Sequence, residues 1–254
     1  MSYTPRPLPQ GFLVRPIAHR GLHDAGSGVI ENTLPAFEAA MALGYGIECD
    51  VQPSVEGEPI VFHDHVLDRL TVEHGEVEAR TAQNLLTLPF RAGTAGMLTL
   101  EDLFARIAGR VPLVVEVKSA FDGRTPQITR IAALAGRYAG PLVFKSFDPV
   151  QIIALRDAGV RQPLGIVAMT LLPEVDEARA RAFGQLTHLD ESRPDFLSWK
   201  AAELPLPQVA ALRDNPGLPV MGWTVRSAEA ARAAAPHLDQ IVFEGFSPEN
   251  TAQP

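Results

Sequence analysis

Eight short apolar segments, rich in Val, Ile and Phe, alternate along this chain with Ala- and Leu-rich segments of helical period. That alternation is typical of repeated strand–helix units around a parallel sheet. Eight strands are the number that closes a (β/α) barrel, and the 254 residues of the chain are enough for one such barrel. The predicted strands end at His19, Val51, Lys118, Ser146, Ala168, Trp199, Thr224 and Phe243. The sequence therefore predicts a TIM-type (β/α)8 barrel.

Helical segments fill most of the connections between these strands. Two of them begin with a polar residue that can accept a hydrogen bond from a free backbone amide, Asp148 before Pro149 and Ser227 before Ala228. The helices are predicted at about 33–43, 100–108, 126–138, 149–158, 174–183, 207–213 and 228–235.

One connection departs from the regular alternation. The apolar segment 58–64 follows the second strand after only a turn at Glu56 and Gly57, so it is predicted to pair with that strand as a hairpin. The chain from about 65 to 96 is polar and longer than an ordinary connection. We expect residues 1–254 to form a single barrel domain, with a small insertion after the second barrel strand at about 65–96 that acts as a lid or a wall.

The charge and the apolar content limit the class of partner. A net charge of -8 opposes binding to nucleic acid or to an anionic membrane surface. No apolar run reaches the roughly 20 residues of a membrane span, and the start of the chain does not have the pattern of a signal peptide. The single cysteine, Cys49, is typical of a reducing compartment. We expect a cytoplasmic protein that binds a small molecule; the sequence does not indicate its oligomeric state.

Carboxylates recur two residues apart at the predicted strand ends. Glu48 and Asp50 lie on one side of their strand, and Glu116 lies at the end of the next barrel strand, two residues before Lys118. Carboxylates buried together repel unless a proton or a cation lies between them. Three oxygen ligands of this kind suit a hard cation, Mg²⁺ or Ca²⁺. The alternatives are a surface stripe for the first pair and a buried ion pair for Glu116 and Lys118.

Two histidines follow apolar strands directly. His19 ends the first strand and His63 ends the hairpin segment, so both are candidates for acid–base chemistry beside a metal. Arg20 offers a planar guanidinium that matches phosphate oxygens, and Lys118 offers a point charge. The other histidines lie in loops or at helix ends and are expected in solvent: His23, His65, His74, His188 and His237.

Seven motifs occur in an order that resembles one known family. They are His19-Arg20-Gly21, Glu31-Asn32-Thr33, Glu48-Cys49-Asp50, His63-Asp64, Glu116-Val117-Lys118, Ser146-Phe147 and Gly222-Trp223-Thr224-Val225. From residue 16 to residue 243 the chain resembles the glycerophosphodiester phosphodiesterases. No single motif is specific, but seven in the same order are.

The resemblance implies a barrel enzyme of lipid and glycerol metabolism. Its reaction is the metal-dependent hydrolysis of glycerophosphodiesters to sn-glycerol 3-phosphate and an alcohol. The implied roles are acid–base catalysis by His19 and His63, metal binding by Glu48, Asp50 and Glu116, phosphoryl binding by Arg20 and Lys118, and contact with the alcohol by Phe147 and Trp223. Simple barrel packing explains the two aromatic residues equally well. Glu31 is expected to orient Arg20 or a histidine, or to cap the following helix.

The sequence departs from the family pattern at four places. Ile30 replaces a usual proline, the loop 22–29 is long, His65 follows the His-Asp pair, and the last strand ends in Glu244 and not in Thr-Asp. These departures bear on the shape of the pocket for the alcohol.

Two other functions fit the same barrel. Lys118 could act as the amine of a Schiff-base aldolase, although neighbouring carboxylates would keep it charged. The chain could also be a catalytically silent protein that binds phosphate esters. Borohydride trapping tests the first alternative, and tight binding without turnover would favour the second.

Overall fold

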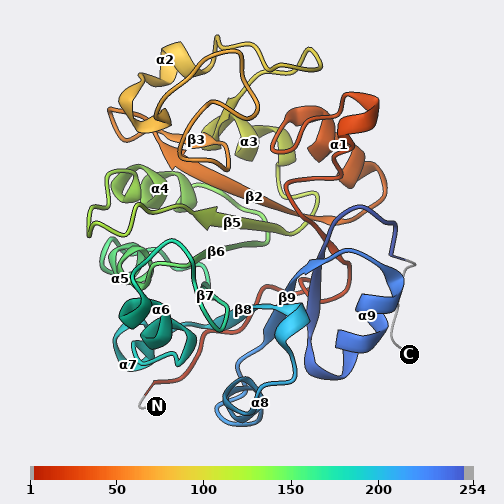
Figure 1. The fold of residues 1–254 in the computed structure, drawn as a ribbon, viewed down its shortest axis with the longest axis vertical. Coiled ribbons are helices and arrows are strands. Elements are labelled where there is room, and N and C mark those ends of the chain that lie inside the picture. Colours follow the sequence, from red (N-terminus) through yellow and green to blue (C-terminus); the bar gives the residue numbers. More distant parts are fainter. Residues whose placement is uncertain (1–2, 249–254) are drawn as a thin grey trace.

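The predicted strands close into a barrel in which each strand runs parallel to its neighbours (Figure 1). This computed structural model describes residues 3–248. The barrel strands are β1 (Ile17–Ala18), β2 (Gly46–Pro53), β5 (Leu113–Val117), β6 (Leu142–Ser146), β7 (Leu164–Ala168), β8 (Phe196–Lys200), β9 (Val220–Val225) and β10 (Gln240–Phe243). β1 pairs with both β2 and β10, which closes the sheet on itself. The prediction of a TIM-type barrel is confirmed.

Helices cover the outside of the barrel at the predicted places. They are α1 (Leu34–Ala42), α3 (Leu100–Ile107), α4 (Ile128–Ala135), α5 (Pro149–Asp157), α6 (Glu177–Gly184), α8 (Pro207–Asp214) and α9 (Ala228–Ala234). Asp148 accepts a hydrogen bond from the amide of Val150, and Ser227 accepts one from the amide of Ala230, so both predicted caps form. A short helix that the sequence pattern did not predict, α7 (Leu189–Ser192), precedes β8.

The alternation of side chains along the strands separates two apolar layers. Residues such as Ile47, Cys49 and Val115 point outward and pack beneath the helices. The residues next to those along each strand point inward. The first inward layer is also apolar: Ile17, Val114, Val143, Phe196, Met221 and Val242. One end of the barrel interior is thus filled with hydrocarbon.

The N-terminal segment closes that end of the barrel. Phe12 is fully buried and packs against the inward apolar layer. The side chain of Gln240, at the start of β10, donates hydrogen bonds to the carbonyls of Phe12 and Arg15, which fixes the segment in place. We call Phe12 and the inward apolar layer the floor of the barrel.

The next inward layer above the floor is charged. Glu116 follows Val114 on the inward side of β5, and Lys145 follows Val143 on the inward side of β6. Glu48 points inward from β2, and all three side chains are buried. The carboxyl ends of the strands, where a TIM barrel places its site, therefore begin with ionised groups enclosed by protein.

The insertion after β2 has strands and an apolar cluster of its own. β3 (Pro59–Val61) pairs antiparallel with β2, as the hairpin prediction required, and β4 (Leu98–Thr99) pairs with β3. Between them lies α2 (Ala82–Leu85), at the top of Figure 1. The apolar side chains of this cluster are Ile30, Ile60, Phe62, Leu67, Val77, Leu85, Leu88, Phe90 and Met97. Ile30 comes from the loop before α1, so the insertion packs on that loop. That residues 1–254 form a single domain stays a prediction.

Among the described residues, none of the helices has both the length and the apolar character needed to cross a membrane.

Candidate active site

Three carboxylates meet above the floor, and we call Glu48, Asp50 and Glu116 the carboxylate cluster. β2 carries Glu48 and Asp50, β5 carries Glu116, and the strand register places Asp50 directly opposite Glu116. One oxygen from each of the three lies within 4.8 Å of the others, and all three side chains are buried. The three residues that the sequence analysis selected as metal ligands are therefore brought together.

Lysines compensate much of this negative charge. Lys145 Nζ lies 3.0 Å from Glu48 Oε1 and 3.2 Å from Glu116 Oε2. Lys118 Nζ lies 2.8 Å from Glu116 Oε1 and 3.3 Å from Asp50 Oδ1. Lys145 was not predicted as a site residue, although it is a lone charge in an apolar strand; the register sets it opposite Glu116.

The remaining carboxylate oxygens accept hydrogen bonds from the loop after β1. The backbone amide of Arg20 donates to Glu48 Oε2 at 3.1 Å, and Asn32 Nδ2 donates to Asp50 Oδ2 at 2.9 Å. Arg20 Nε lies 3.4 Å from the same Asp50 oxygen. Three cations thus contact three carboxylates, and every carboxylate oxygen of the cluster touches a donor of the chain.

The pKa values in the cluster follow from this pairing. Burial raises the pKa of Asp50, but the charges of Lys118, His63, Arg20 and His19 lower it further, to well below its ordinary value. Burial lowers the pKa of Lys118, whereas Glu116 and Asp50 raise it more, so it ends above its ordinary value. Both histidines therefore lie close enough to act electrostatically on Asp50. A lysine held in its charged form is a poor Schiff-base nucleophile, which opposes the aldolase alternative.

The carboxylate cluster fits a hard divalent cation. Its donors are carboxylate oxygens, which Mg²⁺ and Ca²⁺ prefer. Glu48 Oε1 is buried and contacts the Lys145 ammonium, yet no described group donates a well-oriented hydrogen bond to it. An oxygen in that state retains a lone pair for a metal.

His19 and His63 are held in the same way. His19 Nδ1 lies 2.6 Å from Glu244 Oε2, and His63 Nδ1 lies 2.7 Å from Asp64 Oδ1. When Nδ1–H donates to a carboxylate, the second ring nitrogen, Nε2, keeps its lone pair. In the sequence Glu244 is only a departure from the family pattern, whereas in the structure it is the carboxylate that orients His19.

A chain of ion pairs joins the loop after β1 to the start of the insertion. Arg20 Nη1 donates to Glu31 at 2.6 Å, and Arg69 donates to Glu31 and to Asp64 at 2.7 to 3.0 Å. Glu31 thus orients Arg20, one of the predicted alternatives; the alternative of a helix cap is wrong, because Thr33 occupies the cap position of α1. Arg69 was not predicted, since nothing in the polar insertion distinguishes it from other surface arginines.

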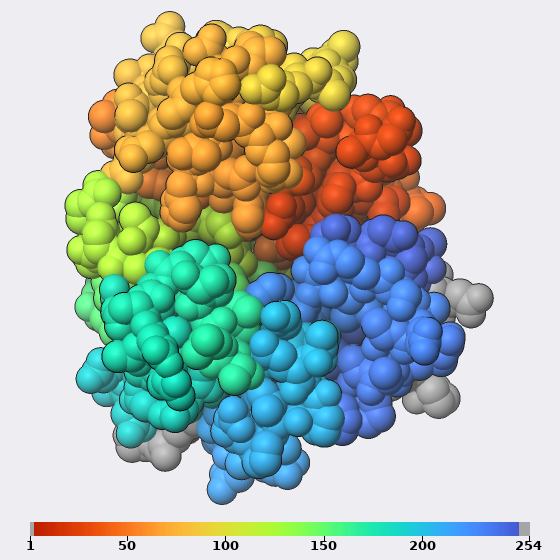
Figure 2. Space-filling model, viewed as in Figure 1, coloured from red at the N-terminus to blue at the C-terminus, as the bar shows by residue number. Residues whose placement is uncertain are grey.

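A cleft of about 520 Å³ opens beside the carboxylate cluster. Its lining includes His63, Glu116 and Lys118 as well as both predicted aromatic residues. Phe147 and Trp223 meet edge to face, with ring centroids 5.4 Å apart, and Trp223 Nε1 donates to the carbonyl of Ser198. In Figure 2 the orange insertion, the teal segment after β7 and the blue C-terminal segments surround a hollow on this face of the molecule.

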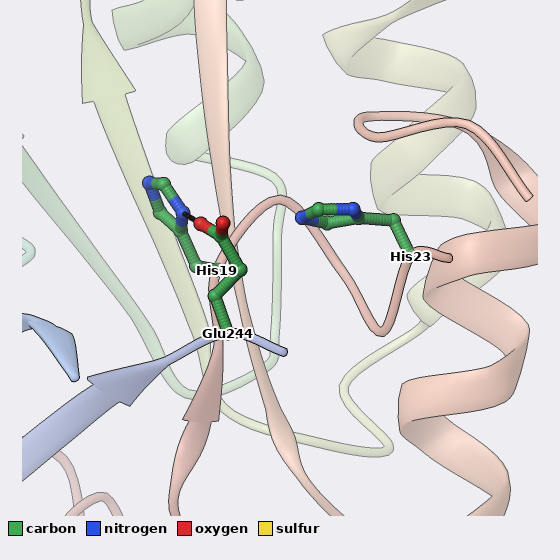
Figure 3. A group of neighbouring side chains, drawn as sticks. All are labelled: His19, His23 and Glu244. Carbon is green, nitrogen blue, oxygen red and sulfur yellow. Dashed lines mark hydrogen bonds and ion pairs between the residues drawn. The ribbon is translucent and has the colours of Figure 1, made fainter. Parts of the chain in front are cut away.

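Two histidines that were expected in solvent are at least partly enclosed. His188 is 9% exposed, and burial lowers its pKa to about 4. His23 lies beside His19 and Glu244, and these three side chains converge in Figure 3. We call His19, His23 and Glu244 the histidine cluster. His23 was not predicted as a site residue because its loop gives no periodic signal.

Comparison with known proteins agrees with this geometry. Residues 19–241 match the glycerophosphoryl diester phosphodiesterase family, which confirms the resemblance inferred from the seven motifs. YhdW of Bacillus subtilis is 26% identical over 242 residues, which cover 90% of this chain and 93% of that protein. A glycerophosphodiester phosphodiesterase of Caldanaerobacter subterraneus is 40% identical over 111 residues, which cover 41% of this chain and 44% of that protein.

Solved structures share the fold. An Oleispira antarctica phosphodiesterase, crystallised with the product sn-glycerol-3-phosphate, aligns with a TM-score of 0.74 and 21% identity over 91% of this chain and 92% of its own. A glycerophosphodiester phosphodiesterase from Agrobacterium tumefaciens aligns with a TM-score of 0.69 and 21% identity over 91% and 96% of the two chains. At this identity the likeness establishes the barrel.

Proposed function

Because the chain belongs to the glycerophosphoryl diester phosphodiesterase family, we propose that it hydrolyses glycerophosphodiesters to sn-glycerol 3-phosphate and an alcohol. The family makes it a phosphodiesterase. We propose in addition the substrate and the roles of the individual residues. The Oleispira protein, which was crystallised with the product sn-glycerol-3-phosphate, supports a glycerophosphodiester as the substrate.

The observation that carries the proposal is the matched support of two histidines. His19 and His63 each bind a carboxylate through Nδ1, at 2.6 and 2.7 Å, and each keeps Nε2 for another partner. The charges of both histidines lower the pKa of Asp50, which belongs to the carboxylate cluster. Hydrolysis of a diester needs one group to take a proton from the nucleophile and one to give a proton to the leaving alkoxide, and this pair can supply both.

The cations around the cluster would bind the phosphoryl group. Arg20 presents a guanidinium that Glu31 holds in place, and Lys118 presents an ammonium at the wall of the cleft. Their positive charge would offset the charge that develops on the phosphoryl oxygens. A divalent cation held by the carboxylate cluster would supply a Lewis acid for the same oxygens.

The apolar wall of the cleft would receive the alcohol. Phe147, Trp223 and Leu172 line it, whereas Lys118 and Glu116 lie at its charged side. A diester would thus bind with its phosphate toward the carboxylate cluster and its alcohol against the aromatic pair. Mg²⁺ and Ca²⁺ both suit the ligand set, and the cytoplasmic location inferred from the single cysteine stays a prediction.

The first experiment measures release of glycerol 3-phosphate from glycerophosphocholine and glycerophosphoethanolamine. Reactions contain EDTA, Mg²⁺ or Ca²⁺, and the variants are His19→Ala and His63→Ala. His74→Ala is the matched control, because His74 also binds a carboxylate, Asp68, through Nδ1 at 2.8 Å but does so on the surface.

We expect metal-restored turnover in the wild type and in His74→Ala, and a loss of about 100-fold or more in each of the other two variants. Retained turnover in His19→Ala or His63→Ala would contradict the assigned roles. Tight binding of the diester by folded protein, without turnover under any metal, would favour the silent binding protein.

A further inference from the structure

The histidine cluster combines ligands of a different chemical kind from the carboxylate cluster. One ligand atom each of His19, His23 and Glu244 lies within 4.8 Å of the others. They come from the end of β1, the loop before α1 and the end of β10, and Figure 3 shows their side chains turned toward one another. Two imidazoles and one carboxylate are the ligand set of many three-residue zinc sites, whose fourth position is left for water.

His23 provides an independent sign that a ligand belongs here. Its Nε2 is buried, and no described residue offers it a hydrogen bond. A buried ring nitrogen without a partner is costly unless a metal, a water or a ligand satisfies it. Burial also lowers the pKa of His23, which leaves the ring neutral and its lone pair free at neutral pH.

The backbone holds His23 near His19 through a tight turn. Gly21 adopts a φ of +79°, and a Cβ there would lie 2.8 Å from the Ala36 backbone, so no other residue fits without a shift. The amide of Leu22 then donates to the Ala36 carbonyl at 2.9 Å. Only three residues separate His19 from His23, and the turn and this hydrogen bond fix the spacing between the two imidazoles.

We propose that His19, His23 and Glu244 form a second metal site that takes a borderline-soft ion such as Zn²⁺, separate from the hard-cation site of the carboxylate cluster. The site carries one negative charge from Glu244, which the exposed guanidinium of Arg226 partly offsets at 3.4 Å. When the metal binds, a bond to His19 and a bond to Glu244 replace the hydrogen bond between these two residues. A third bond gives the buried His23 Nε2 a partner.

Zinc at this site inhibits the enzyme, a consequence that rests on the proposed function. If the metal binds His19 through Nδ1, the ring proton moves from Nδ1 to Nε2, which then cannot accept another. If it binds through Nε2, the nitrogen that faces the reaction is blocked. In either case His19 loses its ability to exchange a proton, so zinc acts as an inhibitor even when the carboxylate cluster holds its own cation.

The test measures binding and inhibition separately. Protein saturated with Mg²⁺ is titrated with Co²⁺, which reports nitrogen ligands through its visible absorption, and Zn²⁺ then displaces it. The variants are His23→Ala, His74→Ala as a matched surface control, and Glu116→Gln, which alters only the carboxylate cluster. Each variant is first shown to be folded by circular dichroism.

We expect one Co²⁺ per chain in the wild type, in His74→Ala and in Glu116→Gln, and an affinity at least about tenfold lower in His23→Ala. The activity assay compares the wild type, His74→Ala and His23→Ala, and the Zn²⁺ concentration for half inhibition should rise by a similar factor only in His23→Ala. Equal Co²⁺ binding in wild type and His23→Ala would overturn the proposal, as would its loss in Glu116→Gln. The binding result stands even for a protein that hydrolyses no diester, so the two proposals can fail separately.

Discussion

The carboxylate cluster and the histidine cluster lie on neighbouring strands of one barrel, yet they solve the problem of buried polar groups in opposite ways. The carboxylate cluster is enclosed, and each of its oxygens touches Lys118, Lys145, Arg20 or Asn32. The histidine cluster is only half-buried and leaves His23 Nε2 without a partner. A fully buried charge is costly unless other groups of the chain neutralise it. A polar group near solvent costs less to leave unpaired, so it can remain available to a ligand.

The largest expected effect comes from removing an internal counter-charge of the carboxylate cluster. Lys145→Met keeps the side-chain volume but leaves Glu48 without its ammonium, so the free energy of unfolding in EDTA should fall by about 3–5 kcal/mol. Added Ca²⁺ should restore more stability to this variant than to the wild type, because the cation no longer competes with Lys145. Urea titrations with and without Ca²⁺ measure both effects.

Lys200→Met provides the control for this substitution. Lys200 also lines the cleft, but it is 40% exposed and pairs with Glu203 at 3.5 Å. A pair of this kind contributes less than about 1 kcal/mol. A similar loss in both variants would mean that burial does not distinguish the two lysines.

The next effect concerns the support of His19 in the histidine cluster. Glu244→Gln keeps a hydrogen-bond acceptor but removes the charge that stabilises a protonated ring, so kcat should fall about 10- to 100-fold with little change in KM. Glu244→Asp should retain more activity than Glu244→Gln. Steady-state kinetics with glycerophosphocholine measure kcat and KM for both variants. A change confined to KM would assign Glu244 to substrate binding and contradict its role in supporting His19.

A smaller effect is the pH dependence of stability. The hydrogen bond from His19, against the opposing effect of burial, lowers the pKa of Glu244 from 4.5 to about 2. A depressed carboxyl pKa stabilises the folded protein above pH 4.5, and that stabilisation is lost as the pH falls toward 2. For this half-buried pair we expect roughly 1–2 kcal/mol after solvent screening. The difference between wild type and Glu244→Gln, measured by urea unfolding from pH 6 to pH 3, should shrink over that interval.

The smallest effect is expected at the link between the insertion and the loop after β1. Arg69 pairs with Glu31 and Asp64, but its side chain is 47% exposed. Arg69→Met should lower the free energy of unfolding by less than about 1 kcal/mol. A loss as large as that of Lys145→Met would show that exposure does not separate the two networks. Salt titration offers a second check, since screening should remove the Arg69 contribution first.

The sequence predicted the barrel strands and those site residues whose inward direction follows from the two-residue period of a strand. Glu48, Asp50 and Glu116 were found because inward residues of a strand recur every second position, and the order of the motifs placed them on adjacent strands. Lys145 follows the same rule, but its pairing with Glu116 depends on the register between β5 and β6, which no local pattern encodes. His23, Arg69 and Glu244 lie beyond strand ends, where side-chain direction depends on turns and on contacts distant in sequence. His188 was wrongly expected in solvent because the short helix α7 that encloses it was not predicted.

The floor of the barrel affects the strength of the ion pairs above it, although its own residues contact no substrate. Phe12 and the apolar layer around it keep water out from below, one layer beneath the buried charges. Attraction between charges weakens steeply when water enters, so the strength of every ion pair above depends on that seal. The segment around Phe12 lies at the opposite end of the barrel from the cleft. By excluding water it keeps the local dielectric constant low and so strengthens the ion pairs of the carboxylate cluster.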